Sequence, residues 1–153
     1  MIASLVTVVV LALGVGACAE TDAAATRNAY VRQLNAAQER LARTATEVKG
    51  AITDASSVRQ DRRTLVRYGA AMGGIVKTLR KVAVPANARP EHAALVAALA
   101  EFRTAITAIV IELRSPTTRA IDDADHQLAD ATKTFDAKLG ASISAINRKL
   151  QAG

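Results

Sequence analysis

An apolar stripe between Glu91 and Leu113 constrains the fold of this chain more than any other feature of the sequence. Its six large side chains recur at alternating spacings of four and three residues: Leu95, Leu99, Phe102, Ile106, Ile109 and Leu113. That spacing places them along one face of an α-helix. Val96, Val110 and Ile111 widen the stripe, so we expect other helices to cover this helix on most of its sides.

Three further stretches carry helical periodicity, each with a single apolar face. The first ends near Ile52, the second covers about residues 58–82, and the last runs from Ser115 to about Leu150. The composition agrees with helices, because the chain has only three prolines and 3% aromatic residues, and alanine supplies much of its apolar content. We therefore predict an all-α fold, an antiparallel up-down-up-down four-helix bundle over residues 26–151.

Polar residues and prolines predict where these helices begin and end. Ser57 and Gln60 have the spacing of a capping box at the start of the second helix. Prolines at both ends of residues 85–90 make the next loop rigid. For the last helix, we expect Ser115 to be the N-cap and Pro116 to occupy the first helical position.

The N-terminal segment is expected to lie outside the bundle. Ile2 to Ala17 is an apolar run of sixteen residues that ends in small residues and is followed by polar Glu20. Such a run is too short to span a bilayer comfortably and is typical of a signal peptide. We assign residues 1–17 to the signal peptide and residues 18–25 to a short tether.

The sequence Val15-Gly16-Ala17-Cys18 resembles the lipobox of bacterial lipoproteins. The resemblance implies cleavage before Cys18, a lipid on its sulfur, and a protein held on the outer face of the cell membrane. An ordinary signal peptidase could instead cut after Ala19, because Ala17-Cys18-Ala19 fits the A-x-A rule. The product would then be secreted without the cysteine, and an uncleaved N-terminal anchor is a third alternative.

The body also resembles a family of small Ala-rich actinobacterial lipoproteins that have no assigned activity. The similarity rests on the run from Leu79 to Pro85, on Glu91-His92 and on the apolar segment from Leu95 to Leu99. It implies the fold and the location of the protein and gives no indication of its chemistry.

A basic stripe on the second helix is the expected interaction face. It consists of Arg59, Arg62, Arg63, Arg67, Lys77 and Lys81. A net charge of +6 is compatible with anionic partners. We expect the partner to be anionic lipid, an envelope polymer or a protein, and not nucleic acid. The alternative is a solvated face that only aids solubility.

Three glycines, Gly69, Gly73 and Gly74, lie inside the second helix. Together they cost about 3 kcal/mol relative to alanine, so their presence needs a reason. The Gly69–Gly73 spacing favours a close helix crossing, for example against Phe102. The alternative is a kink or a small pocket in the middle of the bundle, which would suit a sensor or carrier of small ligands.

No constellation of residues predicts catalysis, a metal site or a cofactor. Asp122, His126 and Asp130 share one helix face, but no second element supplies further ligands. His92 is expected to be exposed in the first turn of its helix, without a catalytic partner. We therefore predict a non-enzymatic, membrane-anchored, extracytoplasmic module that binds a partner, with a small-ligand sensor or carrier as the alternative.

Overall fold

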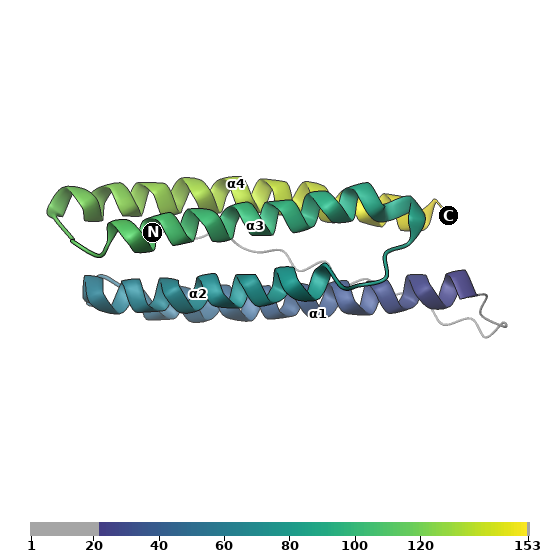
Figure 1. The fold of residues 1–153 in the computed structure, drawn as a ribbon, viewed down its shortest axis with the longest axis horizontal. Helices are drawn as coiled ribbons and strands as arrows, with labels where there is room; N and C mark the ends of the chain where they lie inside the picture. Colours follow the sequence, from purple (N-terminus) through teal and green to yellow (C-terminus); the bar gives the residue numbers. More distant parts are fainter. Residues whose placement is uncertain (1–21, 153) are drawn as a thin grey trace.

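A computed structural model describes residues 22–152 as an all-α fold. Its helices are α1 (Asp22–Ala51), α2 (Val58–Leu79), α3 (Arg89–Glu112) and α4 (Thr118–Gln151), with the 3-10 turn η1 (Ala86–Ala88) before α3. Successive helices run antiparallel (Figure 1). The predicted four-helix bundle is confirmed, with α1 starting inside the expected tether. The proposed signal peptide (1–17) and Cys18 lie outside the described residues.

Helix α3 is the central helix, as its stripe predicts. It packs against both α2 and α4, and the side chains of Leu95, Leu99, Ile106 and Ile109 are at most 2% exposed. By length and composition alone the segment Ala86–Glu112 could also cross a membrane, a property that core helices of soluble bundles share. Here its apolar stripe is covered by the neighbouring helices.

Three aromatic rings join α2, α3 and α4 at the middle of the bundle. Phe102 stacks on Phe135 with ring centroids 4.4 Å apart, and meets Tyr68 edge-on at 5.8 Å. The pKa of Tyr68 is raised to about 12, mainly by burial and to a smaller extent by the negative charge of Asp136. Aromatic pairs in these geometries stabilise the folded state beyond the contribution of the apolar area that they bury.

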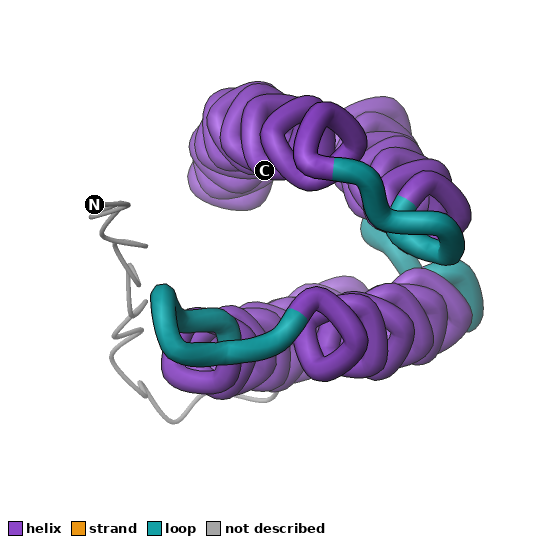
Figure 2. The backbone as a smooth tube through the Cα atoms, turned by 90° about the vertical axis from the view of Figure 1, so that its left-hand side faces the viewer, coloured by secondary structure: helices purple, strands orange, loops and turns teal. Residues whose placement is uncertain are grey.

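The helices pack in series, and within residues 22–152 they leave one side of the bundle open. Helix α1 packs on α2, α2 on α3 and α3 on α4, whereas α1 and α4 hardly approach each other (Figure 2). The predicted apolar face of α4 is therefore only partly covered: Phe135 and Ile146 are buried, but Leu128, Leu139 and Ile143 are half-buried. These half-buried side chains lack the cover that a closely packed α1 would provide.

The described core lies almost entirely within the helices. All of the buried apolar side chains described lie between Tyr30 and Ile146. We call residues 20–153 the bundle body, and this part of the chain carries the complete described core. We therefore expect the bundle body to fold by itself.

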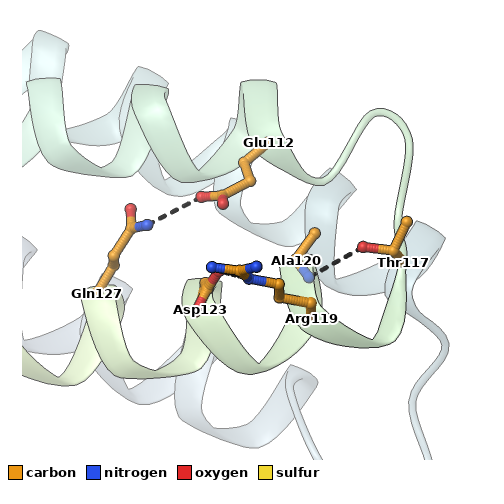
Figure 3. A network of polar contacts seen from close by, with 6 residues as sticks. All are labelled: Glu112, Thr117, Arg119, Ala120, Asp123 and Gln127. Atoms are coloured by element: carbon orange, nitrogen blue, oxygen red, sulfur yellow. Dashed lines mark hydrogen bonds and ion pairs between the residues drawn. The ribbon is translucent and has the colours of Figure 1, made fainter.

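The start of α2 is confirmed and that of α4 differs from the prediction. The hydroxyl of Ser57 accepts a hydrogen bond from the Gln60 amide at 3.4 Å. At α4 the N-cap is Thr117, whose hydroxyl accepts from the Ala120 amide at 3.1 Å (Figure 3). Thr117 has the extended backbone conformation that suits an N-cap. The predicted Ser115-Pro116 start is therefore wrong, and these two residues belong to the loop.

The prediction that His92 is exposed is also wrong. Its side chain is only 7% exposed and bridges two other helices. The carbonyl oxygen of Leu79 can only accept, so Nε2–H of His92 donates to it at 3.1 Å. Nδ1 then accepts from the hydroxyl of Tyr30, also at 3.1 Å. His92 thus fastens the first part of α1 and the end of α2 to the start of α3.

We expect the bundle body to lose stability as pH falls from about 7 to about 5. Burial lowers the pKa of His92 despite the opposing hydrogen bond to Leu79, so the unfolded chain takes up a proton more readily than the folded one. Stability is therefore lost from the unfolded pKa of about 6.5 down to the folded pKa. Urea unfolding at the two pH values measures this loss.

Carboxylates also titrate in this range, so the contribution of His92 is measured as the difference between the wild type and a variant in how the free energy of unfolding depends on pH. His92→Gln should have a shallower dependence than the wild type. His126→Gln changes an exposed histidine of α4 and is the control for the loss of a histidine side chain. Equal slopes for His92→Gln and the wild type would contradict the assigned role of His92.

Candidate functional site

The basic stripe predicted on α2 lies opposite the buried side of this helix. Leu65, Met72, Ile75 and Leu79 fill the core with exposures of at most 2%. We call the opposite side the basic face. It consists of Arg59, Arg62, Arg63, Arg67, Lys77 and Lys81, of which Arg62 is half-buried and the others are exposed. The predicted extension of this helix to about residue 82 is wrong, because α2 ends at Leu79 and Lys81 lies in the turn that follows. This separation gives α2 one apolar and one cationic side.

The basic face takes part in none of the ion pairs found among residues 22–152. Those pairs are Arg119–Asp123, Lys138–Glu101 and Lys149–Glu91, and each involves α4. The acid within α2, Asp61, accepts a hydrogen bond from the Ser56 hydroxyl at 2.6 Å. Arg67 donates to the neutral hydroxyl of Thr64 at 3.3 Å. The positive charges of the face are therefore largely uncompensated.

Two open grooves lie along the basic face. The first, near the start of α2, is lined by Gln60, Arg62, Arg63, Val66 and Arg67. The second lies between α2 and α3 and is lined by Gly73, Val76, Lys77, Arg80, Lys81 and Arg103. Arg80 and Arg103 were not among the predicted site residues. Arg103 belongs to α3. In the sequence it could have been noticed as a charged residue that interrupts the apolar stripe of this helix.

The glycines of α2 lie beneath side chains of neighbouring helices. A β-carbon placed on Gly73 would lie 3.2 Å from Nε and 3.3 Å from Cζ of Arg103. One placed on Gly74 would lie 3.4 Å from Nη2 of Arg40 in α1. At Gly69 the neighbour is Ile106, 3.6 Å away. The nearest atoms to these glycines therefore belong to side chains, and at Gly73 and Gly74 they are guanidinium groups. The sequence had suggested a close helix crossing against Phe102, or a pocket, at this place.

Residues with metal-binding chemistry do not gather in the part of the chain from Asp22 to Ala152. No group of three or more His, Cys, Asp or Glu side chains there could hold a metal ion. Asp122, His126 and Asp130 are all exposed on α4. Comparison of the chain with protein families, curated proteins and solved structures gives no match.

Proposed function

We propose that this protein is a lipid-anchored, extracytoplasmic helical module that docks on anionic lipid through the basic face of α2. The observation that carries the proposal is the row of exposed cations on α2 without ion-pair partners among the described residues. The lipobox-like sequence ending at Cys18 supports the anchor. Helix α1 begins at Asp22, only a few residues after the cysteine, so a lipidated chain would hold the bundle close to the membrane.

The geometry of the bundle favours an orientation in which α2 lies along the membrane. Helix α2 has 22 residues and is about 33 Å long at a rise of about 1.5 Å per residue. Arg59 is near its start, Lys77 is in its last turn and Lys81 lies just beyond its end. This end of α2 lies on the side where α1 begins (Figure 1). An upright bundle would keep Arg59 beyond a Debye length of about 8 Å, so the whole face can bind only when the bundle lies flat.

The basic face and the lipid have different roles in this proposal. A basic residue close to an anionic surface contributes on the order of 1 kcal/mol, and salt weakens that contribution. A lipid anchor supported by such a basic patch gives stable attachment, which neither signal supplies as effectively alone. The face would therefore orient the bundle, and the anchor would retain it.

The bundle body should sediment with vesicles that contain anionic lipid at low salt and release from them at high salt. The test variant changes Arg59, Arg62, Arg63 and Arg67 to Glu and should sediment several-fold less. A control variant changes Arg32, Arg43, Arg114 and Arg119 to Glu, which are exposed residues outside the basic face. It alters the net charge by the same amount and should retain most of the binding.

Equal binding by the two variants would contradict docking through the basic face. Absence of wild-type binding at low salt would contradict lipid docking altogether. In that case the same proteins can be sedimented with an acidic envelope polymer, which is the competing type of surface.

A further inference from the structure

The second groove, between α2 and α3, gathers cations from more than one element. It has a volume of about 410 Å³, and four of its six lining residues are cationic: Lys77, Arg80, Lys81 and Arg103. All four side chains are exposed, and no carboxylate lines the groove. None of them belongs to an ion pair found within residues 22–152. Cations that line one groove repel each other, and a bound anion would offset that repulsion.

Gly73 brings one of these cations close to the backbone of α2. The guanidinium group of Arg103 lies close to Gly73, because a β-carbon there would be 3.2 Å from Nε and would require the arginine to shift by a few tenths of an ångström. A glycine inside a helix costs about 1 kcal/mol relative to alanine. The chain therefore gives up helix stability at the position where Arg103 lies against α2.

We propose that this groove is a binding site for a phosphate monoester, carried by the headgroup of an anionic lipid. Arginine binds phosphate oxygens through its planar fork of donors, and lysine adds compact positive charge. A monoester carries nearly two negative charges and three terminal oxygens, which match a groove with four cations better than the single charge of a diester. The α2 residues that line the groove, Gly73, Val76 and Lys77, belong to the last part of that helix, and α2 ends on the side where α1 begins (Figure 1).

Phosphate binding by the groove is independent of the proposed function, whereas the assignment of the phosphate to a lipid rests on it. The first experiment therefore uses inorganic phosphate alone. Thermal unfolding of the bundle body is followed in increasing phosphate, against chloride at the same pH and ionic strength. A bound anion stabilises the folded state, so the midpoint should rise with phosphate, in proportion to the logarithm of its concentration once this exceeds Kd.

Two variants test the site in this assay. Arg103→Gln removes the α3 cation and should weaken the apparent affinity for phosphate at least about tenfold. Gly73→Ala leaves the net charge unchanged but shifts the guanidinium group by a few tenths of an ångström, so it should reduce the phosphate effect by less than Arg103→Gln does. Gly140→Ala is the control, because a β-carbon there meets nothing within 4 Å. It should keep the wild-type response to phosphate.

Both test variants must first unfold cooperatively in chloride, which shows that they are folded. A wild-type midpoint that phosphate does not raise beyond chloride would overturn the site. An undiminished phosphate effect in Arg103→Gln would overturn it equally.

The second experiment identifies the source of the phosphate. Vesicles containing phosphatidic acid, a monoester, are compared with phosphatidylglycerol vesicles of matched surface charge. The bundle body should prefer phosphatidic acid, and Arg103→Gln should lose that preference while it still binds both vesicles. Equal binding of the wild type to both lipids, together with a phosphate-dependent midpoint, would overturn the lipid source and assign the groove to free phosphate.

The two proposals can fail separately. The variant with Arg59, Arg62, Arg63 and Arg67 changed to Glu leaves the groove intact, so it should lose vesicle binding and keep its thermal response to phosphate. A wild type that responds to phosphate but binds no vesicles would refute membrane docking alone. A wild type that binds vesicles but shows no phosphate effect would refute the groove alone.

Discussion

Phe102→Ala should lower the free energy of unfolding of the bundle body by about 3–5 kcal/mol, the usual cost of truncating a buried phenylalanine. The side chain is 4% exposed and lies between the rings of Tyr68 and Phe135. Its removal would leave a cavity that three different helices border, and they cannot all move inward without disturbing their other contacts. Urea unfolding followed by circular dichroism measures the change.

Ile111→Ala provides the matched control, because it truncates another large apolar side chain of α3. Ile111 is 54% exposed, so its truncation should change the stability by less than about 0.5 kcal/mol. Leu99→Ala, at a position only 2% exposed, should cost about 2–5 kcal/mol. Similar values for Phe102 and Ile111 would contradict the position of α3 at the centre of the fold.

The central helix could be predicted from the sequence because its signal is local. Alternating spacings of four and three residues from Leu95 to Leu113 specify a helical face regardless of which partner covers it. The same property explains why the open side was missed. Leu128 and Leu139 of α4 have the spacing of core residues, and periodicity cannot say whether α1 comes close enough to bury them.

The environment of His92 depends on contacts that are distant along the chain. Its partner Tyr30 is 62 residues away in sequence, and its second partner is a backbone carbonyl, which leaves no trace in residue type. His92 belongs to the first turn of its helix, a position that suggests exposure, and the neighbouring Ala93 and Ala94 are indeed exposed. Burial of a histidine between the ends of three helices becomes visible only once those ends are placed together.

The candidate site was predictable in part for the same reason. The basic face lies on one helix, so its residues could be grouped from their spacing alone. The second groove also needs Arg103, which belongs to α3, and its position over Gly73 depends on how the two helices are aligned. The glycines did indicate an unusual contact on α2, but the sequence could not show that arginine side chains, and not Phe102, make it.

Cys18→Ser should transfer the protein from the membrane fraction to the soluble fraction, or leave it as an unprocessed precursor, if the proposed anchor is correct. Cys18 is the only cysteine in the sequence, so lipid attached through sulfur has no other site, and metabolic labelling with a fatty acid should disappear completely. Ala25→Ser, an exposed change in α1, should keep both label and location. The effect should be large because the basic face alone binds weakly at physiological salt, whereas a lipid anchor combined with that face is stable. A mature wild-type chain that begins at Glu20 would refute the lipid anchor and establish ordinary secretion in its place.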